Sequence, residues 1–480
     1  MSRATQDSSS PLIPSAVVDL LLAEHAAQTQ PGLERLWRYY RNQATYSGGD
    51  TRPNASLNYT SRCTQAQGLP NRLLNQQRDQ SLEIVIENDI AWRVHSLVDF
   101  MFGKPLVIQS LADDPNRRTA ITRLLNETFR ANGGDGFFQD LALLGSIYGY
   151  VDVLVRPGIG PQSNTRLEII EAPRAVPMLS TEDYRQIDAY LIHHTQQTQE
   201  PGDRTFLDRF RRRTCNGVAR KTIERTEVWT ADGFEVYYSS RALTGKRRSR
   251  VEAGGNRLGR VPVIHIQNLA QPFFYPGLSD VEALIPLQDE LNTRLSDRAN
   301  RVTFQSFKMY LGKGIDGFTD RPVGPGQMWS TDNPDAAIHE FGGDASTPSE
   351  DQHIREIREA MDKASGVSPI AAGVVGGKTG NLSSENAIRI VLLGLLARIE
   401  KKRLTYGAGI EQICELILHT ADVTGVLPNS PDERRVRLDW PTPFPDSEAQ
   451  QLRNALTKKE LGVPSEQLLA ELGYSECIGH

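Results

Sequence analysis

One apolar stripe, carried through a run of about 40 residues, constrains this chain more than any other feature. From residue 388 to 417, apolar side chains recur at the spacing of one helix face. The pattern predicts a single very long helix over residues 385–424, about 60 Å long at 1.5 Å per residue. Gly407 and Gly409 lie near its middle, where we expect the helix to kink.

A second long helix is predicted over residues 278–304. Ser279 and Glu282 stand at the spacing of a capping box, which marks where it begins. At about 1.5 Å per residue it would reach about 40 Å. Pro286 falls in its first turns, where a proline can kink a helix.

Three segments separate these two helices. Residues 307–343 have the short strands and Gly/Pro turns of a small module. Residues 351–363 predict another helix with one apolar face. Residues 370–384 are rich in glycine and show no packing pattern, so we expect a flexible loop.

The first part of the chain alternates helices with loops. Helical spacing covers residues 15–45, with a break at Pro31–Gly32, and residues 82–102. Further helices are predicted at 117–131 and 136–146. The polar, Ser-rich start of the chain predicts a disordered arm and lacks the pattern of a secretory signal.

Short β-branched runs replace helices further along. Residues 148–155 predict a strand, and residues 167–260 predict several strands separated by turn signals, in a mixed antiparallel sheet. The basic run Lys246–Arg250 lies in a Gly-rich loop, either as a solvated hairpin tip or as a contact for nucleic acid or an acidic partner. The fold class is therefore α+β.

Composition limits the kind of protein. A chain of 480 residues suggests two to four structural units, and no stretch is apolar enough for a membrane span. The four cysteines are far apart, which argues against a disulfide framework or zinc site and favours a reducing compartment. The net charge of −5 argues against a static DNA clamp, but it permits a channel through which DNA slides.

Two sequence motifs suggest nucleotide binding and fail in context. Residues 372–379 match a relaxed phosphate loop, but no buried strand precedes them. Residues 312–317 match GxGxxG, but the adjoining FTDRPVGPG segment cannot open a helix. His193 and His194 are neighbours on a strand, so they point to opposite faces and make poor co-ligands. We therefore predict no catalytic residue, no metal and no cofactor.

Several segments, taken in order, resemble portal proteins of siphovirus-type tailed bacteriophages. The likeness covers nearly the whole chain after residue 80, and LSDVEALIPLQDELN at 278–292 is its most specific segment. The other matching segments are DFMFGKP at 99–105, LLGSIYGYVDVLV at 143–155, EAPRAVPML at 171–179, RVPVIHIQN at 260–268 and the tail from DWPTPFPDSEAQ at 439–450 to LGVPSEQLL at 461–469.

The resemblance implies a portal-like fold in seven parts. These are an α/β wing at 1–275 with a disordered arm over about 1–14, a stem helix at 276–304, a small α/β clip at 305–350, a second stem helix at 351–369, a tunnel loop at 370–384, a long kinked helix at 385–424 and a helical crown at 425–480.

The resemblance also implies a function. It implies a ring of twelve subunits at one capsid vertex, through which double-stranded DNA is packaged and later ejected. The partners would be the terminase large subunit, head completion or adaptor proteins, and the major capsid and scaffold proteins, with no membrane. The protein would assemble in the host cytoplasm and end in the virion.

The implied DNA-facing site is the tunnel loop, where Lys378 would give a ring of twelve positive charges. Two alternatives stay open: a nucleotide-dependent DNA-processing ATPase built on the relaxed phosphate loop, and a minor capsid or connector protein without a channel. The residues expected to face DNA are Gly373, Val374, Val375, Gly376, Gly377, Lys378, Thr379, Gly380 and Asn381.

Overall fold

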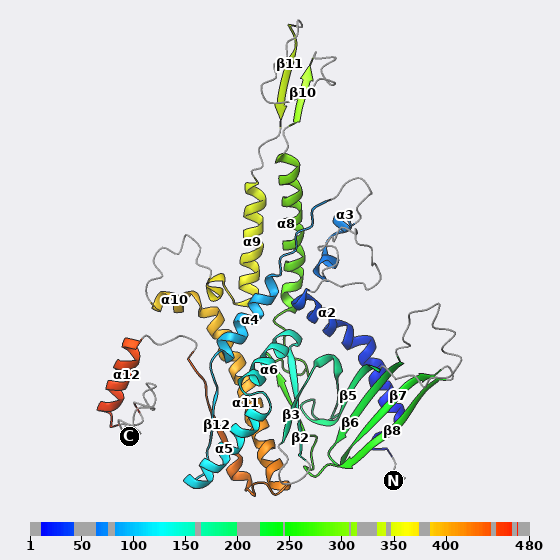
Figure 1. Ribbon diagram of the computed structural model, residues 1–480, viewed down its shortest axis with the longest axis vertical. Helices are drawn as coiled ribbons and strands as arrows, with labels where there is room; N and C mark the ends of the chain where they lie inside the picture. Colours follow the sequence, from blue (N-terminus) through cyan, green and yellow to red (C-terminus); the bar gives the residue numbers. More distant parts are fainter. Residues whose placement is uncertain are drawn as a thin grey trace, which may run out of the picture.

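The protein combines a mixed α/β body with a long two-helix projection (Figure 1). The computed structural model describes residues 11–42, 64–74, 82–158, 165–198, 221–242, 245–306, 309–313, 334–341, 347–373, 385–442, 448–462 and 468.

The chain begins with one continuous helical segment. It consists of α1 (Ser15–Glu24), a π-helical turn η1 (His25–Thr29) and α2 (Gln30–Arg41). The helix predicted here is confirmed, but the break expected at Pro31–Gly32 takes the form of the π turn just before Pro31. Proline has no N–H to donate to the preceding turn, and the wider turn accommodates that loss.

The next long helix is shorter than predicted. Helix α4 spans Asp89–Phe102, and Asn88 caps it by accepting a hydrogen bond from the Ala91 N–H. Residues 82–88 are extended instead of helical, so the prediction was wrong there. Leu82, Ile84 and Ile86 alternate along this extended segment and pack against residues of η3 (Thr64–Gly68) and α3 (Asn71–Leu74).

Helices α5 (Pro115–Ala131) and α6 (Asp135–Tyr148) confirm the two predicted in this region. Strand β12 (Val436–Asp439) pairs antiparallel with β1 (Val107–Ser110). Strand β1 was missed because four residues are too few to show a period.

The strands form two large sheets where one was predicted. The antiparallel pairing is confirmed, but Asp152 and Tyr190 hydrogen-bond across two separate sheets. The three-stranded sheet has the order β3 (Arg166–Ile170), β2 (Tyr150–Arg156), β9 (Val263–Gln267). The five-stranded sheet has the order β4 (Ala175–Leu179), β5 (Ile187–Thr198), β6 (Lys221–Thr230), β7 (Gly233–Ala242), β8 (Gly245–Gly255).

The basic run Lys246–Arg250 lies on β8 and not in a loop, which corrects the prediction. Strand β8 is at the edge of its sheet and pairs only with β7 among the described strands. Arg248 pairs with Asp19 of α1, and Arg250 pairs with Glu235 of β7. Positive charges on an edge strand oppose pairing with another chain.

Two helices form the projection. Helix α8 (Ile285–Ser306) follows the short turn η5 (Glu282–Leu284), and α9 (Pro348–Ser365) runs beside it (Figure 1). At the far end, β10 (Met309–Lys313) pairs antiparallel with β11 (Ala337–Phe341). Pro286 is the second residue of α8, where its missing N–H costs nothing, so it begins the helix and does not kink it.

The long helix predicted near the end of the chain is confirmed with a different break. It consists of α10 (Glu385–Val391) and α11 (Leu393–Val423), and they are separated at Leu392, where ψ is 8°. Helix α11 is continuous through Gly407 and Gly409, where the kink was expected. The turn η7 (Pro431–Arg434) and α12 (Glu448–Glu460) come next, and within the expected helical crown only Leu468 is described after residue 462.

Helix α11 is the centre of the main core. Its buried residues Ile399, Ile410 and Ile413 belong to one cluster with Leu141 of α6 and Val153 of β2. Burying aliphatic side chains on this scale is the dominant favourable contribution to folding. Among the helices that the structure describes, none is long and apolar enough to cross a membrane.

Candidate functional site

The predicted DNA-facing loop begins at the foot of the projection. Helix α9 ends at Gly366, whose φ is +71°, and the turn η6 (Pro369–Ala372) leads to Gly373 with φ +77°. A side chain at residue 373 would meet no atom within 4 Å. Of the nine predicted loop residues only Gly373 is described, and the other eight, Val374 to Asn381, lie outside the described residues.

The elements that flank residues 372–379 do not match those of a nucleotide-binding phosphate loop. A nucleotide-binding loop of that kind needs a buried strand before it, so that its backbone amides face the phosphates. Here the preceding elements are α9 and η6, and the following one is α10. Of the second motif, Gly312 and Lys313 belong to β10, and the remaining residues, 314–317, lie outside the described residues.

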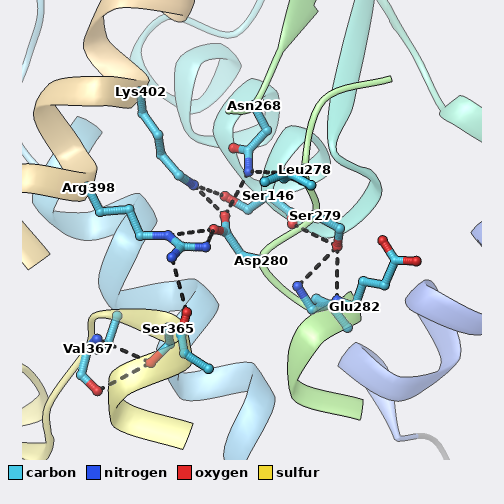
Figure 2. A network of polar contacts seen from close by, with 12 residues as sticks. Ser146, Asn268, Leu278, Ser279, Asp280, Glu282, Ser365, Val367, Arg398 and Lys402 are labelled. Carbon is cyan, nitrogen blue, oxygen red and sulfur yellow. Dashed lines mark hydrogen bonds and ion pairs between the residues drawn. The ribbon is translucent and has the colours of Figure 1, made fainter. Parts of the chain in front are cut away.

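A buried ion cluster lies where the projection meets the body (Figure 2). Asp280 comes just before η5 and is 3% exposed, while Lys402 of α11 is 1% exposed. The Lys402 ammonium donates to Asp280 Oδ2 at 2.5 Å, and Arg398 donates to Oδ1 through Nε at 2.9 Å and Nη2 at 2.7 Å. Asn268 Nδ2 also donates to Oδ2, at 2.9 Å.

The charges around Asp280 keep it ionised. Burial alone raises the pKa of the carboxyl, but the positive charges of Lys402 and Arg398 and the hydrogen bonds from Lys402 and Asn268 outweigh it. The pKa of Asp280 therefore lies below its ordinary value.

The same cluster joins five segments. Lys402 Nζ also donates to Ser146 Oγ of α6 at 2.7 Å, and Arg398 Nη1 donates to the Ala364 carbonyl of α9 at 3.2 Å. Ser279 Oγ accepts the N–H groups of Val281 and Glu282, which is the serine half of the predicted capping box (Figure 2), but the α-helix itself begins later, at Ile285. The base of the projection, including the end of α9, is thus fixed to α6, α11 and the segment after β9.

Sequence reasoning missed this cluster, although one signal for it exists. Lys402 occupies a position on the apolar face of the long helix, between the buried Ile399 and Tyr406. A lysine inside an apolar stripe needs a buried acidic partner, because burying an unpaired charge is expensive. Asp280, 122 positions away in the chain, cannot be identified as that partner without the fold.

The second feature of the projection is a row of polar side chains on α8. Asn292, Ser296 and Asn300 accept the backbone N–H groups of Glu87, Val85 and Glu83 at 3.0, 3.0 and 2.8 Å. Gln288 accepts the Asp89 N–H at 3.0 Å and donates to the Glu87 carbonyl at 2.6 Å.

The spacing of the row explains the fit. Four residues of helix advance about 6 Å, and two residues of extended chain advance about 6.6 Å. Side chains four apart on α8 therefore meet every second residue of 83–89. We call this row and the segment it holds the stem strap: Gln288, Asn292, Ser296 and Asn300 with residues 83–89.

The charges of the projection are close to balanced. Helix α8 carries three acidic and three basic residues, and α9 carries five acidic and three basic ones, a net of −2. Arg298 pairs with Asp351 at 2.7 Å and links the two helices. A surface of this kind does not grip phosphates, because backbone affinity depends on an excess of lysine and arginine.

The histidines and cysteines offer no metal site in the described part of the chain, where no three His, Cys, Asp or Glu side chains are placed to hold an ion. His193 bonds Thr226 Oγ1 and His194 bonds Arg174, so they face different partners. Cys414 is buried in α11, and the other three cysteines lie outside the described residues.

A helical projection on an α/β body, joined to it by a buried ion cluster, defines a protein of α+β fold. The chain belongs to the phage portal protein family, SPP1 Gp6-like, whose family model matches residues 22–473. This confirms the resemblance stated on sequence. Members of that family are structural, non-enzymatic components.

Two solved structures contain similar chains. One is the virion of a native gene transfer agent particle, at 13% identity and a TM-score of 0.40, covering 82% of this chain and 87% of that one. The other is the neck of an empty gene transfer agent particle computed with C6 symmetry, at 14% identity and a TM-score of 0.43, covering 80% of this chain and 90% of that one. No curated protein matches the chain.

Proposed function

We propose that this portal protein forms a ring of twelve subunits at one capsid vertex and that double-stranded DNA passes through its centre during packaging and ejection. Membership of the portal family over residues 22–473 carries the proposal. In this reading residues 1–275 are the wing, 276–304 and 351–369 the stem, 305–350 the clip, 370–384 the tunnel loop, 385–424 the long helix and 425–480 the crown.

The size of a stem ring suits a duplex. Helices pack at about 8–10 Å, so twelve side by side form a ring with a centre-line diameter of about 38 Å. Removing one helix width of about 10 Å leaves about 28 Å open. A duplex with its hydration fits that width, and the near balance of charge on α8 and α9 favours sliding over holding.

The tunnel loop is the proposed contact with DNA. Helix α10, which follows the loop, lies beside the lower end of α9 (Figure 1). One Lys378 per subunit would set a ring of positive charges around the duplex. Each such contact is weak and exchanges in salt, which suits a moving strand.

The far end of the projection, with β10 and β11, is the proposed docking site for the terminase large subunit and later for head completion or adaptor proteins. The wing would contact the major capsid and scaffold proteins. ATP hydrolysis would then belong to the terminase. Assembly would take place in the host cytoplasm, and the finished ring would reside in the virion.

Electron microscopy of the purified protein tests the proposal. End-on views should show closed rings with a central hole wide enough for a duplex. A connector or minor capsid protein without a channel would give no such hole, and a protein that stays monomeric under every assembly condition would contradict the proposal.

A further inference from the structure

A cavity of about 350 Å³ lies in the body, apart from the stem and the tunnel loop. It is bounded by α2, by the end of α6 and by the corner between β3 and the turn η4 (Ala172–Arg174). Its lining residues are Glu34, Trp37, Arg38, Tyr148, Glu171 and Pro173.

Two aromatic rings form one wall. Tyr148 and Trp37 are stacked, with ring centroids 6.1 Å apart and planes 14° from parallel. Tyr148 is only 6% exposed, yet among the described residues its hydroxyl has no hydrogen-bond partner. The ring is buried, but the hydroxyl oxygen at its end is accessible from the cavity, so it can hydrogen-bond a ligand there.

Two carboxylates, of Glu34 and Glu171, line the same cavity as this hydroxyl. Burial raises the pKa of Tyr148, and the negative charges of Glu171 and Glu34 raise it further. The Glu34 carboxylate already accepts hydrogen bonds from Gln30 at 2.8 Å and from Arg38 at 2.7 Å. The Glu171 side chain is exposed and has no ion pair within the described residues, so an unpaired, water-accessible carboxylate lies at the edge of the cavity.

We propose that this cavity binds an organic cation, a guanidinium or alkylammonium group together with its methylene chain. The Glu171 carboxylate would pair with the charge, and the Tyr148 hydroxyl would accept a second hydrogen bond. Methylenes pack well on aromatic rings, and cations are attracted to ring faces. Arg41 already places its guanidinium 5.8 Å from the Trp37 ring centroid.

Other ligands fit the cavity less well. An anion would be repelled by the Glu171 carboxylate. A hard metal ion needs several oxygen ligands, and only one carboxylate of the cavity lining, that of Glu171, has no ion pair within the described residues. The cation has two plausible sources, a free small cation or a lysine or arginine side chain from a neighbouring protein. The proposal concerns a site outside the DNA channel and does not rest on the channel role.

Calorimetric titration of the purified full chain with agmatine at low salt tests the site. The unmodified protein should show saturable binding. Glu171→Gln should weaken it up to about fivefold, because an exposed charge pair is lost, and Tyr148→Phe by a smaller factor. Glu252→Gln removes an exposed carboxylate of β8 far from the cavity and is the matched control. Absence of saturable binding, or equal binding by Glu171→Gln and the unmodified protein, would overturn the proposal.

The same titration on free subunits and on assembled particles separates the two sources. If a free cation is the ligand, both forms bind agmatine equally. If a neighbouring side chain fills the cavity, free subunits bind agmatine, particles do not, and Glu171→Gln weakens assembly. Both results support a cation site, whereas failure of both forms to bind contradicts it, even if the ring and channel are correct.

Discussion

Gly409 of α11 lies against Ile266 of β9 so closely that a Cβ at residue 409 would stand 2.4 Å from Ile266 Cγ1. The glycine therefore lets the long helix approach the three-stranded sheet. Gly409→Ala should force Ile266 or the helix to shift and should lower the free energy of unfolding by about 1–3 kcal/mol. Thermal or denaturant unfolding of the purified protein measures the change.

Gly407 provides the control one half-turn away. A Cβ there would meet Trp440 Cζ2 at 3.8 Å, which is an ordinary contact. Alanine favours a helix over glycine by about 1 kcal/mol, so Gly407→Ala should be neutral or stabilising. If both variants destabilise equally, the close approach at residue 409 is not the cause.

The contrast shows what sequence alone can and cannot predict. From the sequence alone, two glycines in a long helix predict a kink, because glycine weakens helices. The reason for Gly409 is a strand 143 positions earlier in the chain, at Ile266. The long helices, α5 and α6, and most strands were predictable, because their periods are local properties of the sequence.

The errors have equally physical reasons. At residues 82–88, Leu82, Ile84 and Ile86 alternate as in an extended segment, but the helical spacing of the residues that follow them led to one helix being predicted over 82–102. The polar residues of the stem strap look like a solvated face until the segment they hold is placed beside them. The tunnel loop was proposed on composition and resemblance alone, and only Gly373 of it is described.

The Asp280–Lys402 pair should behave as one unit. Asp280→Asn leaves a fully buried ammonium without its charge partner and should cost about 3–5 kcal/mol of stability. Adding Lys402→Met removes the stranded charge, so the double variant should be more stable than Asp280→Asn alone. A double-mutant cycle measures the coupling. Additive effects of the two changes would contradict the pairing.

Acid should weaken this junction. Because the pKa of Asp280 is below its ordinary value of 3.8, the folded and unfolded states are both ionised above that value, and the stabilisation is complete there. As the pH falls below it, the unfolded state takes up a proton first, so stability is lost progressively until the folded carboxyl also protonates. The free energy of unfolding, measured from about pH 6 to pH 3, should fall less steeply in the Asp280→Asn/Lys402→Met double variant than in the unmodified protein.

The stem strap predicts a local change in hydrogen exchange. Asn292 is fully buried, accepts the Glu87 N–H, and donates to Gln65 Oε1 at 3.1 Å. Asn292→Leu leaves both partners unsatisfied, at about 1–3 kcal/mol each. The amides of residues 83–89 should exchange much faster. Asn300→Ala, at the more exposed end, should have a smaller effect because water can replace the lost bonds.

The proposed tunnel contact gives the functional prediction. Lys378→Ala removes one positive charge per subunit from a loop whose ends are anchored by α9 and α10, so rings should still form. DNA filling or retention should change, and the change should shrink as salt rises, because salt already screens such contacts. Lys401→Ala, on an exposed position of α11, removes the same charge outside the loop and is the control. Packaging assays with both variants decide the question: a Lys378→Ala protein that fails to form rings, or that packages and retains DNA like the Lys401→Ala control at every salt concentration, would rule out a DNA-facing role for this lysine.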